Sequence, residues 1–221
     1  MANVVSPYGL RPVNLIGGQA FNGGVIREFR MTANTATGIF NGDLVKIASG
    51  QPTAVVTGDS PVAMNLGTTA GNATSGAPRG VVGVCVGVRY VDPVLKYQVF
   101  AQYLPANAVN GGYTDIWVRV MDDPDALFTI QASSAVGSFS GGIFAAIGRN
   151  APIDFSTAGS TTTGNSGLAL STGTNWGNVA VTSTLALRII DVVRETATDT
   201  YPDLIVKLNT GFHAYQNPVG A

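Results

Sequence analysis

One stretch of the chain, residues 79–105, constrains the fold most, because it has the pattern of two β-strands joined by a turn. It is RGVVGVCVGVRYVDPVLKYQVFAQYLP. Its first half is rich in valine, whose branched side chain fits a pleated and packed surface. Gly83 and Gly87 leave room for a close neighbour, and Asp92–Pro93 predicts a turn because proline fixes φ and donates no backbone hydrogen bond. Residues 96–103 then alternate, as in a strand with one buried and one wet face.

Similar short strand patterns recur along the whole chain, separated by Gly, Pro and Asn turns. The strongest are residues 25–31, 39–47, 114–121, 126–132, 185–193 and 203–208. Nowhere do apolar residues recur at positions 3, 4 and 7 over three turns, so we expect no long helix. The pattern predicts an all-β fold: a small β-barrel or sandwich core with an extended N-terminal arm and long loops.

We expect three parts along the chain. Residues 1–24 are rich in Gly, Asn and Pro and form an extended arm. Residues 25–132 form a β-barrel-like core. Residues 133–221 form a β-rich C-terminal portion with a long Ser/Thr/Gly loop at 156–178, and the sequence leaves open whether this portion is a second domain or a part of the first.

The arm carries the residues that we expect to bind a partner. Its glycines and prolines make it hard to pack alone, whereas its apolar side chains would be poorly soluble if it hung free. Two placements remain open: the arm lies on a neighbouring subunit, or it forms an edge strand on its own domain. On the first, deletion of residues 1–24 leaves a folded protein. The candidate partner-binding residues are Tyr8, Leu10, Arg11, Leu15, Ile16 and Phe21.

Charge is scarce in this chain. Only 11% of its residues are charged, against roughly 25% in an ordinary soluble domain. A surface with so little charge is expected to lie largely against other protein. The alternative is a compact β protein kept soluble by Ser, Thr, Asn and Gly. The net charge of −1 argues against nucleic acid as a partner, because binding phosphates needs clustered Lys and Arg.

Location and redox state follow from what the sequence lacks. It has no run of about 18 apolar residues, so we expect no membrane span. Its first residues lack the basic start and apolar core of a signal peptide. The single cysteine, Cys85, excludes an intrachain disulfide and any multi-cysteine metal site. Synthesis and folding in a reducing cytoplasm are expected.

No residue pattern predicts an enzyme, a cofactor or a metal site. His213, the only histidine, lies in a polar tail, where we expect a surface or interface role rather than acid–base catalysis. Asp122, Asp123 and Asp125 are interrupted by Pro124, and solvated carboxylates at a turn are expected rather than a calcium loop. Cys85 stands among valines, which predicts a buried and inert thiol.

Several segments resemble structural proteins of tailed bacteriophages. They are MANVVSPYGLRPVNLIGG at the start, GIFNGDLVKI at 38–47, the stretch 79–105, DDPDALFTIQA at 122–132, STTTGNSGLAL at 160–170, and the closing LRIIDVV and DLIVKLNTGFHAYQ. The run Gly-Asp-Leu-Val-Lys followed by residues 78–83 is also similar to capsid cement and decoration proteins with small β-barrel domains. This chain is longer than the smallest of them, which leaves room for the arm and for residues 133–180.

The resemblance implies a non-enzymatic cement protein. Such a protein is expected to be made in the cytoplasm of a host bacterium and to end on the exterior of the virion capsid. There it is expected to bind the major capsid protein as a homotrimer at three-fold positions. It clamps neighbouring capsomers and so stabilises the expanded shell.

Two other functions stay open at this point. One is a tail or head-fibre adaptor, which differs in its copy number per particle. The other is a carbohydrate-binding β-sandwich at the virion surface, in which Trp117, Trp176, Tyr113 and Tyr201 stack on sugars. A major capsid protein is disfavoured, because that fold needs a long spine helix.

Overall fold

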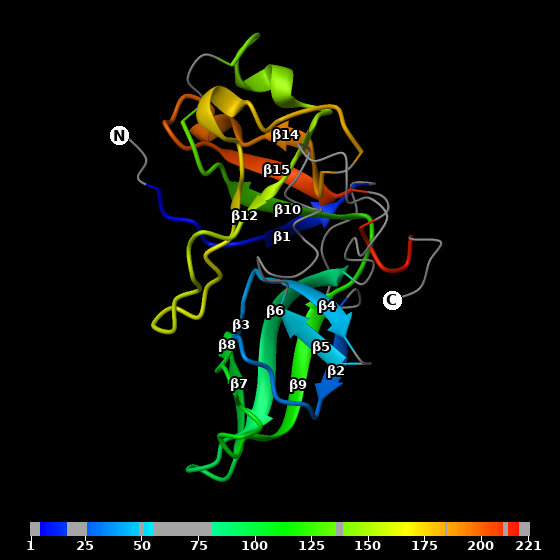
Figure 1. Cartoon of the computed structure of the whole chain (residues 1–221), viewed down its shortest axis with the longest axis vertical. Helices are drawn as coiled ribbons and strands as arrows, with labels where there is room; N and C mark the ends of the chain where they lie inside the picture. Colours follow the sequence, from blue (N-terminus) through cyan, green and yellow to red (C-terminus); the bar gives the residue numbers. More distant parts are fainter. Residues whose placement is uncertain are drawn as a thin grey trace.

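The chain is all-β, as its sequence predicts. The computed structural model describes residues 5–16, 26–48, 51–54, 81–135, 139–183, 185–209 and 212–216. Every pairing between its strands is antiparallel. In these ranges the only helices are short 3-10 turns. Figure 1 shows two β units, one above the other.

The lower unit in Figure 1, here called the N-terminal unit, is built around β6. In spatial order its sheet contains β2 (Ile26–Met31), β9 (Thr114–Met121), β6 (Val81–Val91), β4 (Leu44–Ala48) and β5 (Gln51–Ala54). One edge of β6 pairs with β9, and its other edge pairs first with β4 and then with β7 (Gln98–Ala101). A short pair, β3 (Ile39–Phe40) and β8 (Tyr103–Leu104), lies beside them. The prediction that residues 79–105 form the centre of a sheet, with a turn after Asp92, is confirmed for β6 and β7, whereas residues 79 and 80 lie outside the described ranges.

The upper unit, here called the C-terminal unit, also contains the first strand of the chain. Its sheet has the order β1 (Arg11–Leu15), β10 (Ala126–Gln131), β15 (Asp203–Leu208), β14 (Leu187–Val192) and β11 (Asn150–Ala151). A small pair, β12 (Ile153–Asp154) and β13 (Ala169–Leu170), and the 3-10 helices η2 (Ile143–Ala146), η3 (Thr174–Trp176) and η4 (Arg194–Thr196) complete it. Along the chain, β1 lies in the C-terminal unit, β2 to β9 form the N-terminal unit, and β10 to β15 lie in the C-terminal unit again.

Two hydrophobic cores follow from the alternation of side chains along the strands. In β9, Ile116, Val118 and Val120 point into the core enclosed by the N-terminal unit. Met121 belongs instead to the second core, together with Leu44. This second core also contains side chains of the C-terminal unit, among them Leu10, Phe128, Ile130, Leu204 and Val206. One face of the N-terminal sheet is thus covered at one end by the C-terminal unit, and the two units share a core.

Gly83 is required where β6 passes β9. A Cβ atom at this position would lie 1.9 Å from the carbonyl oxygen of Met121, which no side chain permits. The expected close neighbour at Gly83 is therefore confirmed. Gly87 serves a different purpose, since its nearest such contact is 3.4 Å and its φ is +143°. It lies at a register shift between β6 and β9, where a backbone of this shape favours glycine.

The structure moves the expected boundary between the parts. Residues 126–131 were expected in the first core, residues 25–132. They form β10, which instead pairs with β1 and β15 in the C-terminal sheet. Residues 11–15 form an edge strand on their own chain, which is the second of the two placements considered for the arm. Residues 17–24, including Phe21, lie outside the described ranges. Deletion of residues 1–24 would take a paired strand away from the fold.

Candidate functional site

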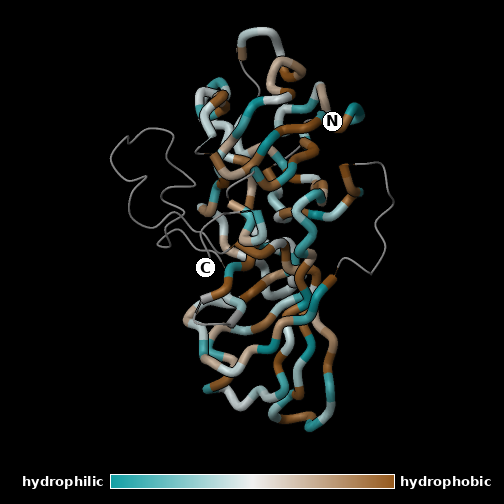
Figure 2. Tube along the Cα trace, turned by 90° about the vertical axis from the view of Figure 1, so that its right-hand side faces the viewer, coloured by the Kyte–Doolittle hydropathy of each residue, from teal (hydrophilic) through white to brown (hydrophobic). Residues whose placement is uncertain are grey.

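A group of large apolar side chains is exposed at the end of the N-terminal unit furthest from the C-terminal unit. It comprises Val94 (82% exposed), Leu95 (53%), Tyr97 (58%) and Phe100 (68%). We call these four residues the hairpin tip, because they lie in and beside the turn between β6 and β7 near the bottom of Figure 1. Figure 2 shows hydrophobic positions at the same end of the molecule. Exposed apolar side chains that gather in one place are common at interaction sites, so the hairpin tip is a candidate for such a site.

Hydrogen bonds hold the backbone of the turn at the hairpin tip. The carboxylate of Asp92 accepts hydrogen bonds from the backbone N–H groups of Val94 and Leu95, both at 2.8 Å. The backbone N–H of Lys96 donates to the carbonyl of Asp92 at 3.0 Å, and Lys96 has a φ of 59°. Since the backbone of this turn is already ordered, a partner would bind it with a small loss of backbone conformational entropy.

Behind the tip, one face of the sheet carries a row of aromatic and arginine side chains. The strand register places in this row Phe100, Arg89, Trp117 and Arg30. The guanidinium of Arg89 lies 4.7 Å from the centre of the Trp117 ring. It also pairs with Glu28 at 3.0 Å and with Asp115 at 3.4 Å. Trp and Arg are the residues most enriched at the energetic centres of protein interfaces, so this face suits protein contact.

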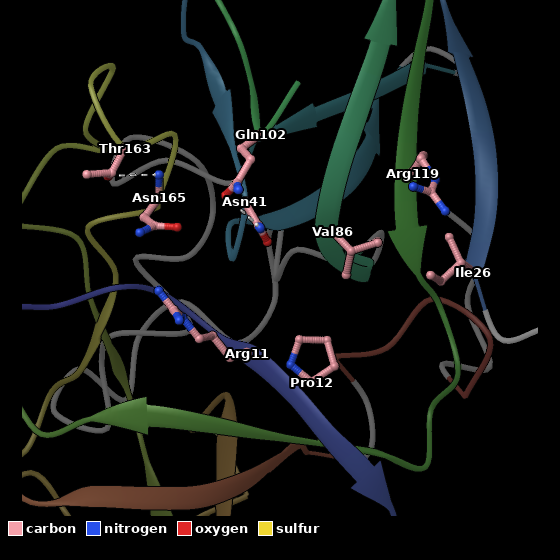
Figure 3. A pocket seen from close by; sticks show the side chains of 9 residues that line it. All are labelled: Arg11, Pro12, Ile26, Asn41, Val86, Gln102, Arg119, Thr163 and Asn165. Atoms are coloured by element: carbon pink, nitrogen blue, oxygen red, sulfur yellow. Dashed lines mark hydrogen bonds between the residues drawn. The ribbon is translucent and has the colours of Figure 1, made fainter. Parts of the chain in front are cut away.

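A second feature is a cleft of about 530 Å³ where the two units meet. It is lined by Arg11, Pro12, Ile26, Asn41, Val86, Gln102, Arg119, Thr163 and Asn165. Figure 3 shows Arg11 on β1 at one side of the cleft and Arg119 on β9 at the other. The lining contains two arginines and no acidic side chain, so the electrostatic potential of the cleft favours an anion.

The two arginines of the cleft are held differently. The guanidinium of Arg11 lies 4.7 Å from the centre of the Tyr8 ring, and the hydroxyl of Tyr8 donates to the carboxylate of Asp203 at 2.8 Å. Burial, and then the charge of Asp203, raise the pKa of Tyr8, so its hydroxyl stays protonated. Arg119 has a long contact of 3.9 Å with Glu28. Both guanidinium groups therefore keep donors for a ligand.

The structure separates the six residues that we expected to bind a partner. Leu10 is fully buried in the shared core and cannot contact a partner, which corrects that expectation for Leu10. Leu15 packs partly buried against the same core, and Tyr8 is half-buried beside Asp203. Among the five that the structure describes, Ile16 is 49% exposed, and Arg11 is exposed and lines the cleft. Phe21 lies outside the described residues.

Two expectations about polar residues are wrong, because the C-terminal tail folds back on β6. His213 is fully buried, not at the surface. Its Nδ1 accepts from the N–H of Tyr215 at 3.2 Å, and its Nε2 has no hydrogen-bond partner among the described residues. Burial lowers its pKa. Asp122 is not solvated either, since it is buried and binds the Tyr215 hydroxyl at 2.8 Å and Arg27 at 3.0 Å.

The sequence also made predictions for Cys85 and Trp176. Cys85 is buried, as predicted, and burial raises the pKa of its thiol to about 12. Trp176 was expected in an open loop, but it is fully buried and its indole N–H donates to the carbonyl of Ser134 at 3.3 Å. It cannot stack on a sugar. In the described part of the chain, no three His, Cys, Asp or Glu residues cluster as a metal site would require.

Sequence reasoning missed the hairpin tip. The turn after Asp92 was predicted, but the exposure of its apolar side chains was not. The signal was present, because Val94 and Leu95 place two large apolar side chains where turns usually have polar ones. The cleft had no signal of this kind, since its lining comes from segments far apart in the sequence.

Comparisons of the chain with protein-family models, with curated proteins and with solved structures found no match. Within the described ranges, no helix has the length and apolar character needed to cross a membrane.

Proposed function

We propose that this chain is a non-enzymatic cement protein that binds the exterior of a bacteriophage head. In this proposal it acts as a homotrimer on the major capsid protein, and the hairpin tip makes the contact. The observation that carries the proposal is the ordered exposure of the four apolar side chains of the tip. The low charge content and the resemblance to phage structural proteins support the same function.

Such a tip can bind a partner through apolar contact alone, without a catalytic or covalent step. Burying apolar surface contributes about 25 cal/mol per Å², and the preformed turn limits the entropy lost on binding. Three copies in a trimer would multiply a weak contact through avidity. A protein that binds the expanded shell more tightly than the precursor shell stabilises the expanded form by mass action.

The burial of Trp176 removes one of the aromatic residues on which the carbohydrate-binding alternative depended. A tail or head-fibre adaptor would use the same kind of apolar contact at a different place on the particle. Location on the particle therefore distinguishes the two virion functions.

The test uses expanded heads that lack this protein, prepared from the phage that encodes it. Purified wild-type protein is added, bound protein is measured by co-sedimentation, and decorated heads are imaged by electron cryomicroscopy. The test variant replaces Val94 and Leu95 by serine. The control replaces Val181, which is 84% exposed on the C-terminal unit, by serine, so a similar exposed valine is lost elsewhere.

We expect trimeric density at three-fold positions for the wild-type and the control, and at least about tenfold weaker binding for the double variant. Density confined to the portal or tail would indicate an adaptor. Equal binding by the double variant would exclude the hairpin tip as the contact, and no binding to any particle would contradict the cement function.

A further inference from the structure

We infer that the cleft between the two units is a separate binding site for an acidic segment of a partner protein, whose carboxylates are bound by Arg11 at one side of the cleft and by Arg119 at the other. The site goes beyond the proposed function, because it lies away from the hairpin tip and can be tested without any particle. Its dimensions suit a ligand: a volume of about 530 Å³ falls among the volumes of known ligand clefts, roughly 300–1,000 Å³.

Charge is the first step of the argument. The two arginines come from different units, one from β1 and one from β9, and lie at opposite sides of a cleft with no acidic residue in its lining (Figure 3). An acidic side chain at either side of the cleft gains charge-assisted hydrogen bonds to the arginine there.

The neighbours of the arginines leave this charge only partly balanced. No ion pair between described residues involves Arg11, whose guanidinium lies against the Tyr8 ring. Glu28 lies 3.0 Å from Arg89 but 3.9 Å from Arg119. A planar guanidinium that is held from one side, with its remaining donors available, is suited to bind a carboxylate through two parallel bonds.

The other polar residues favour a peptide over a bare inorganic anion. The cleft also contains the side chains of Asn41, Gln102, Thr163 and Asn165. An amide both donates and accepts hydrogen bonds, as a peptide backbone does, whereas a phosphate ion needs donors. The amide of Asn41 already donates to Gln102 at 3.3 Å, which fixes the orientation of both groups. The site thus combines a place for a carboxylate with groups that match a main chain.

The experiment measures binding of a fluorescein-labelled Gly-Glu-Gly-Glu-Gly peptide to the full chain by fluorescence anisotropy at low ionic strength. The neutral counterpart, Gly-Gln-Gly-Gln-Gly, and inorganic phosphate as a competitor are measured beside it. The test variants are Arg11→Gln and Arg119→Gln. The control is Arg194→Gln, which removes an exposed arginine of η4 and so the same charge at another place. Thermal unfolding of each variant establishes that it is folded.

We expect binding of the acidic peptide and little binding of the neutral one. Each cleft variant should weaken binding about tenfold, since it removes charged hydrogen bonds, whereas the control should change it by less than about twofold. Arg119→Lys keeps the charge but loses the planar guanidinium group. Its affinity for the acidic peptide should lie between those of the wild-type and Arg119→Gln. In the wild-type, NMR signals of the Asn41, Gln102 and Asn165 side-chain amides should shift on addition of the peptide.

Three results would overturn the inference. The first is absence of peptide binding together with unshifted amide signals. The second is an equal loss of affinity in the control, which would mean non-specific attraction. The third is phosphate binding that depends on both arginines while the peptide does not bind, which would make the cleft a site for a free anion. None of these results bears on the hairpin tip, so a failure here is distinct from a failure of the proposed function.

Discussion

The backbone N–H of Leu10 donates to the carbonyl of Gly42 at 3.0 Å and so joins the residue before β1 to the turn before β4. Gly42 has a φ of +93°, and a Cβ atom there would lie 3.0 Å from the carbonyl oxygen of Tyr8. The Leu10 side chain enters the shared core at the same point. This contact makes residues 8–10 a part of the fold.

Replacement of Gly42 by alanine should destabilise the protein by about 1–3 kcal/mol, because it imposes both backbone strain and a close contact. Gly177 is the matched control, since its φ is −63° and alanine can adopt it. Urea unfolding measures both. If Gly42→Ala were as stable as Gly177→Ala, the structure around Gly42 would accommodate a Cβ atom without a loss of stability.

Leu10→Ala should lower the free energy of unfolding by about 2–5 kcal/mol, as expected for a fully buried leucine. Ile16→Ala, at a 49% exposed position in the same segment, should change it by no more than about 0.5 kcal/mol. Chemical denaturation of both variants makes the comparison. Equal stability of the two would mean that the segment is a separable arm after all.

His213 should make the protein less stable in mild acid. Burial lowers its pKa from the ordinary value of 6.5, so the unfolded chain binds a proton more readily than the folded one. Its contribution to stability is therefore complete above pH 6.5 and is lost as the pH falls below it. In His213→Asn, whose side-chain oxygen can accept from Tyr215, this part of the pH dependence should vanish. An unchanged slope between pH 5 and 6.5 would contradict the assignment.

Asp43 should act in the opposite direction. Burial raises its pKa from 3.8 to about 6, although the carboxylate accepts from the N–H of Phe40 at 2.8 Å. The folded protein therefore holds this proton more tightly, and the associated stability is lost as the pH rises from about 4 to 6. The stability of Asp43→Asn relative to the wild-type should rise across that range and then stay constant. Unfolding curves at several pH values measure this difference in stability. A difference that does not change between pH 4 and 6 would contradict the prediction.

The Cys85 thiol should resist alkylation while the protein is folded. Its burial and a pKa of about 12 leave almost no accessible thiolate at neutral pH. Iodoacetamide should modify the wild-type only in urea, and Leu10→Ala should react faster because it unfolds more often. Rapid modification of the native wild-type would show that the interior of the N-terminal unit opens readily.

The sequence by itself determined most of the longer strands. The alternation of apolar residues in β9, the valines of β6 and the turn after Asp92 are patterns between residues that are close in the sequence. Such patterns predict strands and turns from local backbone geometry alone. The burial of Cys85 among valines and the close approach at Gly83 follow from the same stretch. The all-β class therefore needs no knowledge of which strands are neighbours.

Only the tertiary structure decided which strands pair and which polar residues are buried. β10 follows β9 directly in the chain yet pairs with β1 and β15, because strand pairing depends on contacts between distant segments. His213 lies in a polar tail and would be taken for a surface residue, until the N–H of Ala214 is seen to donate to the carbonyl of Val81 at 2.7 Å. The cleft exists for the same reason. Arg11 and Arg119 become neighbours of one space only when two sheets that share a hydrophobic core are packed together.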